Sequence, residues 1–134
     1  MCGICGIYNF DKSKVLDKDI HSMNDEMHLR GPDDSGVYTR NNIGLGMKRL
    51  SIIDVNNGHQ PMVSDDGEVI VVFNGEIYNF IELRKDLLNK GYLFSTSSDT
   101  EVIIQMYKEY GENFVKMLNG MFAICLFDKK QNNF

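Results

Sequence analysis

Residues 69–79 read Val-Ile-Val-Val-Phe-Asn-Gly-Glu-Ile-Tyr-Asn and combine two local signals. The uninterrupted apolar run 69–73 is typical of a buried β-strand, and a helical pattern of apolar residues begins near Phe80. The polar residues at 74–79 are therefore expected at a strand-to-helix corner. A corner of this kind directs backbone N–H groups and polar side chains toward one point in space.

The polar residues of this stretch suit the stabilisation of a developing negative charge. Asn74 offers a side-chain amide donor, and Gly75 lets its backbone N–H approach a ligand because no Cβ stands in the way. Glu76 adds a fixed negative charge beside them. The stretch therefore predicts an oxyanion hole with a cation-binding group next to it.

The segments on either side alternate between strand-like and helix-like patterns. The pairs Asn79 with Glu82 and Ser98 with Glu101 match capping boxes, which mark the starts of helices. Expected helices cover residues 17–30, 80–90, 98–110 and 112–118. Expected strands cover residues 4–10, 36–39, 43–53, 69–73, 92–95 and 121–127.

Hairpin-type turns between strands, with the helices in groups, favour an α+β fold with antiparallel sheets over a doubly wound parallel sheet. The run 121–127 is apolar on both faces, which predicts a central strand covered on both sides. A hairpin-turn sequence follows at 128–133, and then only Phe134. A hairpin turn without its second strand leaves an open edge, so we expect a sheet that is incomplete at the C-terminus.

Composition excludes several classes of function. The 134 residues favour one domain, and 43% hydrophobic with 25% charged residues is an ordinary globular mixture. A net charge of -5 argues against nucleic acid and against an anionic membrane as partners. No apolar run approaches the roughly 20 residues that cross a bilayer. The N-terminus lacks the basic region of a signal peptide, so a cytoplasmic protein is expected.

The cysteines do not suggest a disulfide or a metal site. Cys2, Cys5 and Cys125 cannot all pair, so reduced thiols are expected. Cys5 and Cys125 lie in apolar strand patterns, where a cysteine is usually a small buried hydrophobe. Cys2-x-x-Cys5 resembles half of a metal or redox motif, but no second pair follows and no histidine has finger-like spacing. A metal- or redox-binding protein is the weakest of the alternatives.

Cys2 stands directly after the initiator methionine. Removal of Met1 would leave Cys2 with a free α-amine, whose pKa of about 7.7–8.0 suits it to take the proton of its own thiol. The thiolate is the nucleophilic form of cysteine. If Met1 were retained, this amine would be an amide and no activity would be expected.

Several motifs follow one another along the whole chain. They are MCGICGI at 1–7, RGPD at 30–33, RLSIID at 49–54, NGEIYN at 74–79, SDTE at 98–101 and GMFA at 120–123. Together they closely resemble the N-terminal glutaminase domain of glutamine-hydrolysing asparagine synthetases. These are class II glutamine amidotransferases of the N-terminal-nucleophile hydrolase fold. Within that class, the motif at 74–79 points to the asparagine synthetase branch.

The resemblance implies an αββα sandwich of two mainly antiparallel sheets flanked by helices. It implies that residues 1–134 form a single glutaminase domain that lacks its last strands and the synthetase domain. The glutaminase step would need no cofactor, because ATP and Mg²⁺ serve only the synthetase domain. Glutamine and that synthetase domain are the implied partners, and a homodimer through the open sheet edge remains open.

The resemblance also implies catalytic roles for Cys2, Asn74 and Gly75. The Cys2 Sγ would attack the side-chain amide carbon of glutamine, which gives a γ-glutamyl thioester and releases ammonia. Asn74 and the Gly75 N–H would hold the oxyanion. Water would then hydrolyse the thioester to glutamate, and in the parent enzymes the ammonia amidates aspartate.

Further residues would bind the substrate. Arg49 would pair with the α-carboxylate in a forked geometry that lysine cannot copy. Glu76 and Asp99 would hold the α-ammonium, and backbone groups near Ile52 and Ile53 would touch the substrate.

Each of these residues also has an ordinary structural explanation. Arg49 could be a solvated strand residue, and Asp99 could simply favour the first turn of a helix. Asn74-Gly75 could be a plain turn. The main alternative is therefore a catalytically silent fragment of the same fold, or a module that binds glutamine or a partner subunit.

Overall fold

A computed structural model describes residues 2–131 of the chain. Its strands are β1 (Gly3–Tyr8), β2 (Asp34–Arg40), β3 (Ile43–Arg49), β4 (Met62–Val63), β5 (Val69–Ile77) and β6 (Gly120–Asp128). Its helices are α1 (Asp17–Asp25), α2 (Phe80–Asn89), α3 (Asp99–Tyr110) and the 3-10 helix η1 (Gly111–Met117). Within residues 2–131, no helix combines the length and the apolar character needed to cross a membrane.

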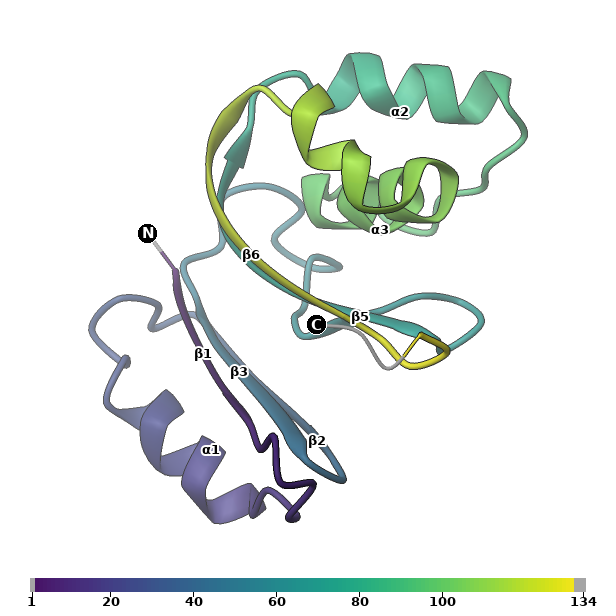
Figure 1. Cartoon of the computed structure of the whole chain (residues 1–134). Coiled ribbons are helices and arrows are strands. Elements are labelled where there is room, and N and C mark those ends of the chain that lie inside the picture. The colour runs from purple at the N-terminus through teal and green to yellow at the C-terminus, as the bar shows by residue number, and fades with distance from the viewer. Residues whose placement is uncertain (1, 132–134) are drawn as a thin grey trace.

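The elements form four stacked layers (Figure 1). One sheet has the strand order β1-β3-β2 and the other β4-β5-β6, and every pairing is antiparallel. Helix α1 contacts all three strands of the first sheet, while α3 contacts β5 of the second and packs against α2. This arrangement confirms the expected α+β class and the αββα sandwich.

Strand β5 is the centre of both hydrophobic cores. Successive residues of a strand point to opposite faces. Accordingly, Ile70 and Val72 pack with residues of β3 between the two sheets. Val71 and Phe73 pack on the other face, with residues of α3. The apolar run at 69–73 is therefore a strand, as predicted, and its residues are buried on both faces.

The pairing of β1 with β3 brings the N-terminus to the far end of β3. In this antiparallel register Gly3 lies opposite Lys48. The residue before β1 is consequently placed beside the residues that follow β3, and the Cys2 Sγ donates a hydrogen bond to the Leu50 carbonyl at 3.6 Å.

The predicted corner at 74–79 begins four residues later than expected. Residues 74–77 continue β5, because they pair with residues 120–123 of β6 and so keep the ladder of backbone hydrogen bonds. Gly75 has a φ of +154°, and a Cβ there would overlap the carbonyl oxygen of Met121. The chain turns only at Tyr78 and Asn79 before α2 begins.

Several other element boundaries differ from the prediction. Helix α1 ends at Asp25, and residues 26–30 form turns with hydrogen bonds between residues three apart. Strands β1 and β3 end at Tyr8 and Arg49, earlier than expected, and 92–95 is not a strand. Strand β4 was not expected, because its two residues are too short to show a period.

The two predicted capping boxes behave differently. The Ser98 side chain accepts a hydrogen bond from the Thr100 N–H and caps α3, as predicted. Its partner Glu101 instead accepts bonds from the backbone of Ser95 and Thr96. Asn79 makes no side-chain cap, because its amide bonds the backbone at Met117 and Asn119.

Strand β6 is not the fully covered central strand that was expected. Among the described residues it lies at an edge of its sheet, paired only with β5. Its second half packs into both cores, but Met121 is 64% exposed at its start. A turn begins at Lys129 as predicted, and the end of the expected hairpin, 132–134, lies outside the described residues.

Candidate active site

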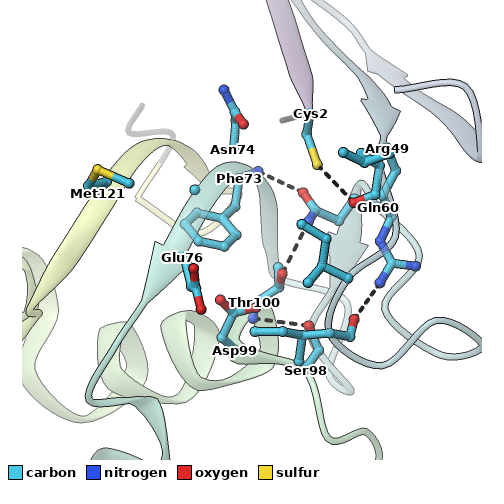
Figure 2. Close-up of a pocket in the computed structure, with 14 residues that line it drawn as sticks. Cys2, Arg49, Gln60, Phe73, Asn74, Glu76, Ser98, Asp99, Thr100 and Met121 are labelled. Atoms are coloured by element: carbon cyan, nitrogen blue, oxygen red, sulfur yellow. Dashed lines mark hydrogen bonds between the residues drawn. The ribbon is translucent and has the colours of Figure 1, made fainter. Parts of the chain in front are cut away.

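One cavity of about 130 Å³ gathers all the residues for which the sequence predicts chemistry (Figure 2). It lies where the start of β1, the end of β3, the middle of β5 and the start of α3 meet the loop after β3. The predicted residues that line it are Cys2, Arg49, Ile52, Ile53, Asn74, Gly75, Glu76 and Asp99.

Cys2 is the thiol that faces this cavity. Its side chain is half-buried, and the Arg30 Nε donates to its backbone oxygen at 3.1 Å, which fixes the chain at this point. The other two thiols are also free, but burial raises the pKa of Cys5 and raises that of Cys125 to about 11. A raised pKa keeps a thiol protonated and unreactive near pH 7.

Asn74 and Gly75 are residues of β5 that line the same cavity as Cys2. Within residues 2–131, the buried Oδ1 of Asn74 has no hydrogen-bond partner. Buried polar atoms are nearly always bonded, so an unpaired one at a cavity indicates a group available to a ligand. The adjacent Gly75 has no side chain to cover its backbone. A Cβ at this position would overlap the backbone of β6.

Glu76 and Asp99 bring two carboxylates close to each other at the cavity, as Figure 2 shows. Asp99 is only 4% exposed, and its Oδ2 accepts a bond of 3.3 Å from the Ile77 N–H. Burial raises the pKa of Asp99, against the lowering effect of backbone hydrogen bonds, and the charge of Glu76 raises it further. Two adjacent carboxylates of this kind favour a bound cation.

Arg49 is not the solvated strand residue of the alternative explanation, because it is 5% exposed. Its guanidinium donates to the carbonyl oxygens of Ile53, Asp54 and Val55 at 2.7, 3.0 and 3.3 Å. These bonds hold the loop after β3 around the charged group. A Cβ on Gly58 would overlap the same guanidinium, so the loop closes tightly over it.

The two isoleucines of that loop differ in exposure. The Ile52 side chain is 73% exposed, whereas Ile53 is half-buried. Both line the cavity, and the Ile53 carbonyl is engaged by Arg49.

Residues that the sequence analysis did not select also line the cavity. They are Leu50, Gln60, Phe73, Ser98, Thr100 and Met121. Gln60 lies in the segment predicted as an irregular loop, and a single polar residue without a pattern gives no signal in one sequence. Ser98 and Thr100 flank Asp99 and could have been inferred from its position in the first turn of a helix.

The described residues contain no group of three or more His, Cys, Asp or Glu side chains arranged to hold a metal ion. The cavity instead combines a thiol, a neutral amide with a glycine N–H, a buried guanidinium and two carboxylates. Such a set can bind a zwitterionic ligand and attack an electrophilic carbon in it.

Comparison with known proteins identifies the fold and the family. Glutamine phosphoribosylpyrophosphate amidotransferase from Bacillus subtilis, solved with ADP and GMP, superposes with a TM-score of 0.72 over 96% of this chain and 35% of that one, at 20% identity. That likeness identifies the fold as that of an N-terminal-nucleophile hydrolase. The chain matches the glutamine amidotransferase domain family over residues 1–134 and belongs to that family.

Particular relatives are glutamine-hydrolysing asparagine synthetases. Asparagine synthetase 1 of Bacillus subtilis is 44% identical over 98% of this chain and 21% of its own length. The enzyme of Brassica oleracea is 42% identical over the whole chain and 23% of its own length. The chain therefore spans about a fifth of the length of these relatives.

Proposed function

We propose that this chain hydrolyses the side-chain amide of glutamine to glutamate and ammonia. The observation that carries the proposal is the shared cavity in which Cys2 meets Arg49, Asn74, Glu76 and Asp99. These residues supply a nucleophile, a cationic group for the α-carboxylate, an oxyanion donor and an anionic site for the α-ammonium. Glutamine carries the matching α-carboxylate, α-ammonium and electrophilic side-chain amide in one small molecule.

Catalysis proceeds in two steps at Cys2. After loss of Met1 the free α-amine takes the thiol proton, and the thiolate attacks the amide carbon of the substrate. The C–N bond breaks, the nitrogen leaves as ammonia with that proton, and a γ-glutamyl thioester remains. Water then attacks the thioester, which releases glutamate and restores the thiol.

Asn74 and Gly75 stabilise the oxyanion of each tetrahedral intermediate. The Asn74 side-chain amide turns about its last bond at little energetic cost, which exchanges Nδ2 for the unpaired Oδ1. The donor then points where the charge develops, together with the Gly75 N–H. Preorganised donors of this kind typically contribute the largest electrostatic share of rate enhancement.

Arg49, Glu76 and Asp99 orient the substrate. A guanidinium carries five N–H donors, so the contacts of Arg49 with the loop carbonyls leave capacity for a carboxylate. The two carboxylates hold the ammonium, with backbone groups of Ile52 and Ile53 closing one side. Substrate binding at both ends places the amide carbon against the Cys2 Sγ.

The ammonia is destined for asparagine synthesis by an ATP-dependent synthetase domain. The similarity to asparagine synthetases four to five times longer than this chain supports that partner. ATP and Mg²⁺ belong to the synthetase reaction, and the glutaminase step uses no cofactor. A cytoplasmic location fits this metabolic role.

The test combines intact mass with a diazo-ketone that mimics glutamine. We expect a mass without Met1, and one adduct that maps to Cys2 and is prevented by excess glutamine. Cys125→Ala, which removes a thiol of raised pKa, should leave labelling unchanged. A chain that loses Met1 yet gives no protected Cys2 adduct would contradict the proposal. It would favour the catalytically silent module instead.

A further inference from the structure

Gln60 lines the cavity with a buried amide whose two ends are both bound. Its side chain is 4% exposed. The Oε1 accepts a hydrogen bond of 2.7 Å from the Phe73 N–H, and the Nε2 donates one of 3.1 Å to the Thr100 Oγ1. Figure 2 shows Gln60 between these partners, which belong to β5 and to α3. One neutral side chain therefore bonds to both β5 and α3, two of the elements that line the site.

The sheet register explains why a side chain is used at this point. Strand β4 pairs Met62 with Val71, so the next rung in the same register places residue 60 opposite Phe73. The backbone carbonyl of Gln60 is directed instead toward Gly36 of the other sheet, where a Cβ would overlap it. The Gln60 side-chain oxygen takes the place of the missing backbone acceptor, so the Phe73 N–H is satisfied.

Each partner of Gln60 is adjacent in sequence to a residue of the proposed site. Phe73 precedes Asn74 on β5, and Thr100 follows Asp99 in the first turn of α3. A change at residue 60 is therefore transmitted through one peptide bond to the oxyanion donor and through another to the ammonium-binding carboxylate.

We propose that Gln60 is a positioning residue that fixes the distance between the Asn74–Gly75 donors and Asp99, and so matches the cavity to the length of its substrate. The inference rests on the proposed glutaminase function. The proposed reaction requires that the α-ammonium of glutamine is bound and that its side-chain amide is polarised. Gln60 bonds the side chain of Thr100, next to the ammonium-binding Asp99, and the backbone of Phe73, next to the oxyanion donor Asn74.

The experiment compares Gln60→Leu with the matched variant Gln105→Leu. Gln105 is also a buried glutamine, 6% exposed, and its Nε2 donates to the Leu93 carbonyl at 3.2 Å, but it does not line the cavity. The kcat and KM for glutamine, the diazo-ketone labelling rate of Cys2 and the melting temperature are measured for both variants and for the wild type.

We expect Gln60→Leu to lower kcat/KM roughly tenfold, which corresponds to the loss of one or two ordinary hydrogen bonds. Most of the change should appear in KM. Gln105→Leu should lower the melting temperature similarly but leave kcat/KM within about twofold of the wild type. Equal kinetic losses in the two variants, or wild-type kinetics in Gln60→Leu, would overturn the inference.

A second variant keeps the question answerable if Gln60→Leu does not fold. In Gln60→Glu the carboxylate can accept from the Phe73 N–H, and the Thr100 hydroxyl can turn to donate to it. The titratable and charged groups that line the cavity around it are Cys2, Arg49, Glu76 and Asp99. The added charge should raise the already raised pKa of Asp99 further, so the acidic limb of the kcat/KM profile should move to higher pH. A pH profile that coincides with that of the wild type would contradict the positioning role of Gln60.

The wild type separates this inference from the proposed function. Turnover and glutamine-protected labelling in the wild type, with no effect of either Gln60 variant, would reject the positioning role alone. A wild type that neither turns over nor labels would reject the function, and the positioning role would fall with it.

Discussion

The carboxylate of Asp54 accepts a hydrogen bond of 2.7 Å from the backbone N–H of Ser97, which joins the loop after β3 to the segment before α3. The same carboxylate accepts bonds from the backbone and side chain of Asn57, and the Asp54 carbonyl accepts one from Arg49. The bond to Ser97 is the main reason why the pKa of Asp54 lies below its usual value. Asp54 therefore holds the loop that carries Ile52 and Ile53 closed over Arg49.

Replacement of this carboxylate should weaken substrate binding more than folding. In Asp54→Asn one carboxylate oxygen becomes an NH₂ group, which donates and does not accept. The one remaining oxygen cannot accept from both Ser97 and Asn57. We expect the KM for glutamine to rise roughly three- to tenfold, as for the loss of one ordinary hydrogen bond, with little change in kcat. Asp11→Asn is the control, because Asp11 accepts a similar bond from the Ser13 N–H in an exposed turn outside the cavity. An unchanged KM in Asp54→Asn would show that the loop is held without this contact.

If Asp99 binds the α-ammonium as proposed, glutamine binding should depend on pH in a definite direction. Burial raises its pKa, so it becomes neutral at a higher pH than an ordinary aspartate, whose pKa is about 3.9. Only the ionised form attracts an ammonium group. Affinity for glutamine should therefore fall as the pH falls through the raised pKa of Asp99, and Asp99→Asn should bind weakly with this dependence removed. KM profiles of both proteins from neutral to acidic pH test the expectation.

Asp99 should affect the stability of the fold with the opposite pH dependence, because its contribution to stability is lost as the pH rises. Because the folded-state pKa of Asp99 exceeds the unfolded value, its stabilising contribution is present below the unfolded pKa and is lost as the pH rises through the folded pKa. Asp99→Asn should therefore have a higher free energy of unfolding than the wild type at neutral pH, and the difference should shrink in acid. Urea unfolding of both proteins at both pH values measures this, and an Asp99→Asn variant less stable than the wild type at neutral pH would contradict it.

Which residues gather at the site was more predictable from the sequence than the backbone geometry that carries them. Cys2, Arg49 and Asp99 are far apart in the chain, yet the family resemblance carried by the motifs selected all three, and they line one cavity. Asn74 and Gly75 were predicted at a corner but lie within β5, because a strand continues for as long as a partner such as β6 supplies hydrogen bonds. That pairing depends on residues about 45 positions later, which local propensity cannot anticipate.

The remaining differences have the same origin in tertiary contacts. Asn79 has the sequence of a helix cap, but the backbone at Met117 and Asn119 competes successfully for its amide. Gln60 had no local signal at all, since its importance comes from the opposite register position at Phe73. Periodicity predicted α3 because its apolar stripe and its cap are both local in sequence.

Gly75 should be far less tolerant of substitution than another glycine with positive φ. A Cβ at Gly75 would meet the Met121 carbonyl and the Phe122 backbone, whereas at Gly91, with φ +93°, it would meet nothing within 4 Å. Gly91→Ala bears backbone strain alone and should lower the free energy of unfolding by about 1–2 kcal/mol. Gly75→Ala adds overlap with β6, and we expect a loss of about 3 kcal/mol or more. Urea unfolding of the two variants measures the difference, and equal losses would mean that β6 can move away from β5.

The hydroxyl of Tyr107 should contribute to stability and not to catalysis. It donates a hydrogen bond of 2.9 Å to the Asp128 Oδ2 in a buried position, and burial raises the pKa of Tyr107 to about 12, so the donor stays protonated. Tyr107→Phe leaves a buried carboxylate oxygen without that donor and should lower the free energy of unfolding by about 1–3 kcal/mol. In the matched variant Tyr92→Phe, the lost bond to Glu109 is partly exposed, so the loss should be below about 1 kcal/mol. Neither tyrosine lines the cavity, so glutamine turnover should be unchanged in both variants. A fall in turnover without a fall in stability in Tyr107→Phe would show instead that the hydrogen bond between α3 and β6 controls the site.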